Sequence, residues 1–529
     1  MQAGLVFILS VLLVSSAMCT VRSKRKSVAR RFPPDFGFGA STAAYQTEGA
    51  WDVDGKGWSM WDHLVRTDPN HIANSSTGDI AANSYHNYRR DVQMLKELGS
   101  KYYRLSISWP RILPYGRGDY VEPRGIAYYN DLINELLTNG ITPFVTMYHW
   151  DLPQHLNEQG GWLNEEIIDW FGDYARVLYQ NFGDRVKHWL TINEPYIHCL
   201  FGYGTGIHAP RLKSPGIFFY ECGRNILLAH ARAYQIYNEE FRSTQNGQVA
   251  IVISSDWAYP ASDLLDDLEA TEDYFAFHLR QFSDPIFSKT GNYPQRLIDR
   301  VQAASTAEGL STSRLRPFTQ EQIDLIRGSS DFMALNSYTS RYVYRNSSLE
   351  GAYEIPSNDN DAFLGTHMDE SWPPSASPWT REHAPGLYNL LVYIKNIYNN
   401  SPIYITETGF STVGSDLNDD GRVQYHRNYL NSVLDALDEG VDVRGYFAWS
   451  LLDNFEWTMG YTLKFGLYQV DMEDVKRTRT PRKSALVYKE IINSRVIDYE
   501  YNPDPYADGA VATSVSILLI SVAIFNITL

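Results

Sequence analysis

Two patterns of hydrophobic and polar residues alternate along this chain. Short apolar runs, rich in β-branched and aromatic residues, have the composition of buried strands. Longer stretches between them repeat apolar residues at the spacing of an amphipathic helix; residues 127–137 keep that spacing and end at Asn139-Gly140, a pair that commonly terminates a helix. Strands that alternate with helices build a parallel sheet with crossover helices. The pattern therefore predicts an α/β protein.

Eight apolar runs have the length of strands, and they occur within one uninterrupted region. Between Phe32 and Asn502 we find no linker rich in serine and proline, no low-complexity segment and no short-period repeat. Eight β/α units in a single domain, residues 32–502, predict a (β/α)8 TIM barrel whose working residues sit at the C-terminal ends of the strands. The predicted strands are residues 36–40, 102–108, 142–147, 187–192, 248–254, 331–335, 403–406 and 444–449.

Polar and aromatic side chains follow these predicted strands, where a barrel places its active site. Taken singly, a histidine or tryptophan at such a position is most often part of the packing. Their joint position at one rim favours a site instead. In chain order the residues are Gln46, His149, Trp150, Asp151, Asn193, Glu194, Asn336, Tyr338, Glu407, Trp449, Glu456 and Trp457.

Two of these residues, Glu194 and Glu407, stand directly after apolar, β-branched runs that are far apart in the sequence. Pro195 prevents the first strand from continuing, and Gly409 interrupts the second. One glutamate after a strand is usually an ordinary solvated charge. Two carboxylates at two strand exits of one barrel are what a glycosidase needs if the fold brings those exits together.

The composition narrows the range of partners. The chain has 529 residues, of which 44% are hydrophobic and 20% charged, and its formal net charge is −16. Such a globular, acidic body argues against nucleic acid or an anionic membrane surface as binding partner. The 13 Trp, 37 Tyr and 23 Phe supply ring faces that pack a core and also suit the apolar faces of sugars.

From Phe32 to Tyr499 the chain resembles glycoside hydrolase family 1, the retaining β-glucosidases, and within it the animal β-glucosidase, lactase-like and myrosinase-like group. The resemblance implies cleavage of a β-glucosidic bond by double displacement, without a metal or organic cofactor. Glu194 would be the acid/base and Glu407 the nucleophile that forms a covalent glycosyl-enzyme. The segments that carry the resemblance are residues 36–49, 149–153, 191–195, 405–409 and 449–457.

The same resemblance implies roles for the other rim residues. Sugar hydroxyls would be bound by Gln46, His149, Asn193, Trp449 and Glu456, and Asn336 is counted with these substrate-binding residues. Tyr338 would hydrogen-bond the nucleophile, Arg104 would lie beside it, and Trp457 and Phe465 would line the pocket.

Two positions depart from the family's usual pattern. The nucleophile motif usually reads Thr-Glu-Asn-Gly, whereas this chain has Thr408 in place of the asparagine. We expect loop rigidity or rate to be affected and the mechanism to persist, because the carboxylate remains. Ser337 stands where relatives often have an aromatic residue, and we expect it to affect the pocket shape alone.

The expected substrate is a β-glucoside or oligosaccharide, with fucose and galactose as side activities. Glu456 would repel a sugar phosphate, and Glu194 favours an oxygen leaving group. Loops 202–215 and 346–378 are expected to contact the aglycone, whose identity the sequence does not fix. Two alternatives stay open: a myrosinase-type thioglucosidase acting on glucosinolates, and a non-catalytic klotho-like receptor. The oligomeric state also stays open, with a homodimer among the options.

The two ends of the chain carry signals of the secretory pathway. Residues 1–19 hold an apolar run followed by small residues, which indicates a cleaved signal peptide, and residues 20–31 form a basic linker or short pro-segment. In the tail, residues 503–529, the apolar stretch has no Lys or Arg after it, which favours a GPI-anchor signal over a membrane span. We therefore expect an extracellular or cell-surface protein held by a lipid anchor.

Asparagines and cysteines fit that route. Asn74 and Asn346 lie in Asn-Ser-Ser triplets and are predicted glycosylation sites. After removal of the signal peptide only Cys199 and Cys222 remain, too few for a disulfide framework. Whether these two pair stays open, because bridging depends on their separation in the fold.

Overall fold

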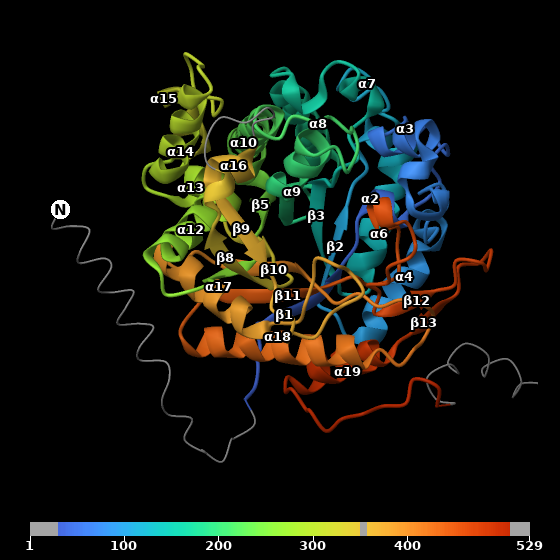
Figure 1. Cartoon of the computed structure of the whole chain (residues 1–529). Coiled ribbons are helices and arrows are strands. Elements are labelled where there is room, and N and C mark those ends of the chain that lie inside the picture. Colours follow the sequence, from blue (N-terminus) through green and yellow to red (C-terminus); the bar gives the residue numbers. More distant parts are fainter. Residues whose placement is uncertain (1–29, 350–356, 508–529) are drawn as a thin grey trace, which may run out of the picture.

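The computed structural model describes residues 30–349 and 357–507, and its centre is a closed barrel of eight parallel strands (Figure 1). Each strand pairs with the next barrel strand along the chain, and the last one closes against the first. All eight predicted strands are present, so the predicted TIM barrel is confirmed. The barrel strands are β1 (Gly37–Ser41), β2 (Tyr102–Ser106), β3 (Thr142–Tyr148), β4 (His188–Asn193), β5 (Gln248–Ser254), β7 (Met333–Asn336), β10 (Ile403–Thr408) and β11 (Val443–Trp449).

Helices connect the strands and surround the barrel in Figure 1. The predicted helix 127–137 lies within α6. The helices are α2 (Ala44–Thr47), α3 (Met60–Thr67), α4 (Ser84–Leu98), α5 (Trp109–Ile112), α6 (Pro123–Thr138), α7 (Gln154–Asn157), α8 (Ile167–Phe182), α9 (Pro195–Cys199), α10 (Phe218–Ile236), α11 (Arg242–Gln245), α12 (Leu265–Phe275), α13 (Gln281–Phe287), α14 (Gln295–Ala307), α15 (Gln320–Ile326), α16 (Asn358–Ala362), α17 (Ala384–Ile397), α18 (Asp420–Asp438) and α19 (Lys483–Ser494).

Side chains fill the amino-terminal end of the barrel interior, so that end is closed. The apolar cluster there includes Tyr102, Phe144, Tyr404 and Phe447, each from a different barrel strand. A Cβ atom at Gly37 of β1 would come within 1.7 Å of the Tyr102 ring, so glycine at that position makes room for the tyrosine. Because the strands are buried on both faces, they read in the sequence as continuous apolar runs.

A second, smaller sheet extends from the carboxyl ends of the barrel strands. Strand β6 (Trp257–Pro260) follows β5, and β8 (Ser340–Arg345) follows β7. These two strands pair in parallel, and β9 (Leu364–His367) pairs antiparallel with β8. The sheet therefore lies on the side of the barrel where the active site is expected. A separate hairpin is formed by β12 (Tyr468–Val470) and β13 (Arg479–Pro481).

The predicted signal peptide lies outside the described residues, as do residues 20–29 of the basic linker and residues 508–529 of the tail. Within residues 30–349 and 357–507, no helix combines the length and the apolar character needed to cross a membrane. In the same part of the chain, no group of three or more His, Cys, Asp or Glu side chains is arranged to hold a metal ion.

Candidate active site

Glu194 lies at the point where β4 ends and α9 begins. Its backbone φ is 48°, a left-handed conformation that non-glycine residues adopt at a cost and only where the surroundings enforce it. Here the Glu194 amide donates to the Val252 carbonyl of β5 at 3.0 Å, and the Trp150 indole donates to the Asn193 carbonyl at 2.8 Å. Pro195 opens the short helix directly after it. The barrel therefore fixes the direction in which this carboxyl group points.

Glu407 lies within β10, one residue before its end, rather than after the strand as the sequence suggested. The β-branched neighbours Thr406 and Thr408 continue the ladder, and the register with β7 shifts at this point. The Arg104 guanidinium of β2 donates to one Glu407 oxygen, and the Tyr338 hydroxyl donates to the other at 2.8 Å. Both donors suit a carboxylate anion.

A continuous hydrogen-bond network joins the two glutamates. Arg104, which contacts Glu407, also donates to Asn193 Oδ1 at 2.7 Å. Asn336 Nδ2 donates both to that same oxygen at 3.2 Å and to Glu194 Oε1 at 2.8 Å. Four barrel strands supply these groups, so two residues that are distant in the sequence meet in one buried network.

The charge on one glutamate affects the other. Burial, followed by the negative charge of Glu407, raises the pKa of Glu194 to about 8. At neutral pH Glu194 is therefore protonated and able to donate a proton. The site thus holds one acid and one anion, a pair that both retaining and inverting glycosidases use.

Both glutamates line one cavity of about 810 Å³ at the carboxyl end of the barrel. The structure brings almost all predicted site residues into its wall. Asn193, Arg104 and Asp151 differ: all three are buried and none of them lines the cavity. Asn193 and Arg104 hold the lining residues from behind. The predicted residues in the wall are Gln46, His149, Trp150, Glu194, Asn336, Tyr338, Glu407, Trp449, Glu456, Trp457 and Phe465.

Three of these side chains have buried polar atoms without a hydrogen-bond partner among the described residues. Gln46 Oε1, His149 Nδ1 and Glu456 Oε1 are buried and accept or donate no hydrogen bond among the described residues. Gln46 is held in place through its other end, because its Nε2 donates to Asn454 Oδ1 and to the Phe455 carbonyl, each at 2.9 Å. Buried polar atoms normally have partners, so these three atoms suit the hydroxyls of a bound sugar.

Burial sets the protonation of two of these groups. It lowers the pKa of His149 well below its ordinary value, so the ring is neutral. His149 Nε2 lies 3.2 Å from the amide nitrogen of Asn193, which can only donate, so the ring proton is assigned to the free Nδ1. Burial also raises the pKa of Glu456 to about 8.

The two departures from the family pattern have different surroundings. The Thr408 hydroxyl lies 2.7 Å from the Tyr425 hydroxyl, which donates to the Tyr338 carbonyl at 2.9 Å. Thr408 therefore takes part in the support of the tyrosine that contacts the nucleophile. Ser337 is buried and does not line the cavity.

The outer half of the cavity contains residues that sequence reasoning did not single out. Both loops expected to contact the aglycone contribute to it, for example through Ile207 and Leu364. The remaining lining residues come from inserted segments that carry no recognisable motif. They include Tyr196, Asp256, Tyr274, His278, Arg341 and Trp379.

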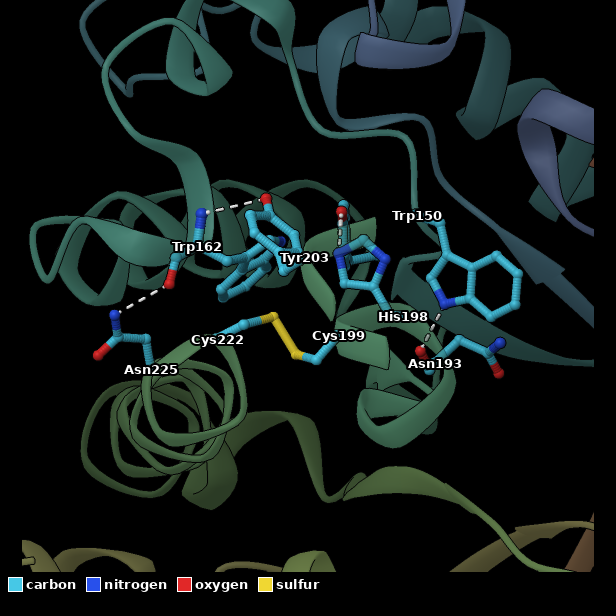
Figure 2. Close-up of a disulfide and its surroundings, with 9 residues drawn as sticks. Trp150, Trp162, Asn193, His198, Cys199, Tyr203, Cys222 and Asn225 are labelled. Carbon is cyan, nitrogen blue, oxygen red and sulfur yellow. Dashed lines mark hydrogen bonds between the residues drawn. A yellow bond between two sulfur atoms is a disulfide. The ribbon is translucent and has the colours of Figure 1, made fainter. Parts of the chain in front are cut away.

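A disulfide anchors the segment that carries Tyr196 and Leu200 of the cavity wall. Cys199, the last residue of α9, is bonded to Cys222 of α10, and their Cα atoms are 5.7 Å apart (Figure 2). Both residues are fully buried. The sequence left this pairing open, and the fold decides it. The bond ties the short helix that starts beside Glu194 to a long helix of the barrel exterior.

Comparisons with known proteins agree with this geometry. The sequence profile of Glycosyl hydrolase family 1 matches residues 28–496. Myrosinase 1 of Brevicoryne brassicae is 45% identical over 467 residues, which cover 88% of this chain and 99% of that protein. Cytosolic beta-glucosidase of Homo sapiens is 40% identical over 470 residues, covering 88% and 99%.

A solved structure of a rice beta-glucosidase variant in a covalent complex with Glc is also similar. It has a TM-score of 0.82 and 36% sequence identity, and the match covers 87% of this chain and 98% of that one. The family profile covers every barrel strand of this chain together with Glu194 and Glu407, and the chain therefore belongs to glycosyl hydrolase family 1.

Proposed function

We propose that this protein is a retaining β-glucosidase that hydrolyses glucosides by double displacement. The observation that carries the proposal is the buried network in which a protonated Glu194 and an Arg104-bound Glu407 share one cavity. Two carboxyl groups with opposite protonation are the acid and the nucleophile of this reaction.

The reaction runs in two steps on these residues. In the first step, Glu407 attacks the anomeric carbon while Glu194 gives its proton to the departing oxygen, and a glycosyl-enzyme forms. In the second step, the deprotonated Glu194 takes a proton from water, which displaces Glu407 and releases the sugar with retained configuration. Arg104 and Tyr338 hold Glu407 in position for the attack.

Glucose is the sugar that the deep end of the cavity supports best. Gln46 Oε1 can accept from a hydroxyl, His149 Nδ1 can donate to one, and Glu456 Oε1 can pair with another. An analogue without those hydroxyls would leave buried polar atoms unpaired, which costs binding energy. The covalent complex of the rice relative with Glc supports the same choice.

A thioglucosidase is the second candidate, because the relative named Myrosinase 1 is 45% identical. The presence of Glu194 favours O-glycosides over S-glycosides as substrates. An alkoxide leaving group needs a proton from an acid, whereas a thiolate leaves without one. Turnover of cellobiose, an aryl glucoside and a glucosinolate at equal concentration separates the candidates. If the glucosinolate is turned over faster than cellobiose and the aryl glucoside, the protein is a thioglucosidase and the β-glucosidase proposal is wrong.

We also propose that the protein passes through the secretory pathway. A fully buried disulfide is typical of proteins that fold in an oxidising compartment, and Asn74 is exposed to solvent in a short turn. Asn346 is partly exposed. Removal of N-glycans should increase the gel mobility of the expressed protein, and phospholipase treatment of cells should release it if the tail directs a lipid anchor. Retention on the cells after that treatment would contradict the anchor.

Covalent labelling tests the proposed reaction. A 2-deoxy-2-fluoro-β-glucosyl fluoride should inactivate the protein and add one fluoroglucosyl group to the peptide that contains Glu407. Nuclear magnetic resonance of a hydrolysis mixture should show the β-anomer of glucose first. An α-anomer as first product would contradict retention, and the absence of both adduct and turnover would favour the non-catalytic receptor.

A further inference from the structure

The place where substrates enter the cavity is marked by lining residues whose side chains are exposed. Ile207, Trp379 and Met459 line the cavity and are 42%, 43% and 39% exposed, whereas Glu194 and Glu407 are buried. The three exposed residues come from segments that follow the barrel strands β4, β7 and β11. We call the region around these three residues the cavity mouth. A bulky group attached beside the mouth would stand in the path of a substrate.

A loop of residues 68–77, called the mouth loop, supports one side of the cavity mouth. His71 Nε2 lies 2.6 Å from the Ile207 carbonyl oxygen, which is within hydrogen-bond distance. An ion pair between Asp68 and Arg211 joins the same two segments. The first half of the mouth loop therefore holds the segment that brings Ile207 to the mouth.

The second half of the mouth loop packs against the segment that brings Met459 to the mouth. The Tyr461 hydroxyl donates to the Thr77 carbonyl oxygen at 2.7 Å. A Cβ atom at Gly460 would lie 2.9 Å from the Ala73 carbonyl oxygen, so glycine at that position permits the close approach of the two segments. The mouth loop therefore bridges two sides of the cavity mouth.

Asn74, a predicted glycosylation site, stands between these two sets of contacts. Asn74 and the next residue, Ser75, are both exposed. The backbone φ of Asn74 is 56°, a left-handed conformation that asparagine adopts more readily than most residues. A glycan attached to the Asn74 side chain would therefore start on the solvent side of the mouth loop, next to the segments of Ile207 and Met459.

Asn346, the other predicted glycosylation site in the described part of the barrel domain, is also next to the cavity. It follows Arg345, the last residue of β8, which pairs with Leu364 of β9. The Asn346 amide donates to the Phe363 carbonyl at 2.9 Å, and the Leu349 amide donates to the Asn346 carbonyl at 3.0 Å. Leu349 and Leu364 both line the cavity, so Asn346 lies between two lining segments.

We propose that N-glycans on Asn74 and Asn346 flank the cavity mouth and exclude glucosides that are attached to long polymers. A glycan is a bulky, hydrated chain on the protein surface. In Figure 1, helix α3, which precedes the mouth loop, and strand β9, beside Asn346, lie on different sides of the barrel. A polymer that approaches the mouth would therefore meet one glycan or the other. This inference rests on the proposed β-glucosidase function and secretory route, and it names the size class of the substrate.

The chain provides a matched control in a third Asn-X-Ser triplet, which begins at Asn399. Asn399 is exposed, and its φ of 52° is close to the 56° of Asn74, so glutamine should perturb the backbone equally at the two positions. Asn399 lies between α17 and β10, at the amino-terminal end of the barrel. Because the cavity is at the carboxyl end, a change at Asn399 leaves the mouth untouched.

Two substrates with the same reactive bond provide the test. One is 4-methoxyphenyl β-glucoside, and in the other a long polyethylene glycol chain replaces the methyl group. The protein is expressed in eukaryotic cells, and mass spectrometry of its glycopeptides measures the occupancy of each asparagine. In the double variant Asn74→Gln/Asn346→Gln, the ratio of kcat/KM for the polymer-linked over the small substrate should rise about threefold or more, because two bulky chains leave the mouth. Asn399→Gln should keep the wild-type ratio.

Enzymatic removal of the glycans separates loss of the glycan from loss of the asparagine. After this treatment the wild-type protein should reach the ratio of the double variant, and the ratio of the double variant should not change further. Unoccupied Asn74 and Asn346 in the secreted protein, a ratio that glycan removal leaves unchanged, or an equal rise in Asn399→Gln would overturn the inference.

Turnover of the small substrate separates failure of this inference from failure of the proposed function. The small substrate carries no polymer, so its kcat/KM should be the same in the glycosylated, deglycosylated and variant proteins. If the wild-type protein hydrolyses it and the ratios do not respond, only the role of the glycans is wrong. If the glycosylated and the deglycosylated protein both fail to hydrolyse it, the proposed function itself is wrong.

Discussion

The two halves of the cavity are built in different ways. The deep half consists of residues at or just after barrel strands, such as Gln46, His149 and Glu407, whose backbones belong to a closed hydrogen-bonded frame. The outer half consists of residues from inserted helices and the small sheet, such as His278 and Arg341. The frame positions the deep half, whereas packing between insertions positions the outer half.

The two halves are suited to different tasks, recognition of the sugar in the deep half and contact with the leaving group in the outer half. The deep half presents buried polar atoms without protein partners and is suited to read the hydroxyls of one sugar. The outer half presents aromatic rings, such as Tyr196 and Tyr274, and the ion pair between Asp256 and Arg341. A change in the deep half should therefore affect every substrate, and a change in the outer half should affect substrates according to their leaving group.

The largest effect is expected for Glu407→Gln. All glycosides should lose turnover on the order of 10⁴-fold or more, because the covalent step has no nucleophile. Folding should persist, since Arg104 keeps its hydrogen bonds to Thr146 and Asn193. Steady-state kinetics and thermal unfolding check this, with exposed Glu473→Gln as control. Activity near the wild-type level on an aryl glucoside would refute the assignment of the nucleophile.

Glu194→Gln should give the next largest effect and should discriminate between leaving groups. Cellobiose hydrolysis should fall on the order of 10²- to 10⁴-fold, because a sugar alkoxide needs a proton to leave. A 2,4-dinitrophenyl glucoside should still form the glycosyl-enzyme rapidly, visible as a burst of dinitrophenol. Added azide should then restore turnover, since it attacks without a base. Equal losses for both substrates would argue against Glu194 as the acid.

The pH dependence of kcat/KM tests whether Asp256 in the outer half acts on Glu194 in the deep half. Cellobiose kcat/KM should fall about tenfold per pH unit above about 8, because Glu194 must be protonated and its pKa is about 8. Glu407, Arg104 and Asp256 are the charged groups that act on Glu194.

Asp256→Asn should shift that alkaline limb to lower pH, since it removes a negative charge that stabilises the protonated acid. Burial also raises the pKa of Glu456 to about 8, and the charges that act most on Glu456 are those of Glu407 and Asp453. The shift in the variant therefore identifies the titrating group. An alkaline limb at the same pH in both proteins would assign it to another residue.

The smallest effect on activity is expected from Cys199→Ala/Cys222→Ala. The free energy of unfolding should fall by about 3 kcal/mol, the value for a bond that closes a loop of this length, 23 residues in separation. Denaturant titration checks this. Formation of the fluoroglucosyl adduct should stay within about twofold, whereas kcat/KM for aryl glucosides should fall, because α9 carries Tyr196, which lines the outer half of the cavity. An unfolding free energy equal to that of the wild type would contradict the role of the bond.

Much of the deep half could be predicted from the sequence, because a barrel strand is recognisable as an apolar run and the end of that run is easily located. Glu194 before Pro195 and His149 before Trp150 are examples. The exact end of a strand was less reliable: Glu407 lies inside β10, since the threonines on either side of it continue the ladder. The resemblance to a known family then supplied the expected roles.

The outer half could not be predicted in the same way. Asp256, His278 and Arg341 stand in segments with no spacing rule, and nothing local shows that they face one cavity. The pairing of Cys199 with Cys222 could not be predicted from the local sequence either, because it depends on how α9 packs against α10. Such contacts join insertions from different β/α units.

The sequence by itself determined the eight-strand barrel and the two glutamates at its rim, because periodicity and strand ends are local properties of the chain. Only the tertiary structure decided the hydrogen-bond network between Glu194 and Glu407, the disulfide, and the meeting of His278, Asp256 and Arg341 at one cavity. The physical reason is that these features depend on distances between segments far apart in the sequence, and side-chain packing sets those distances.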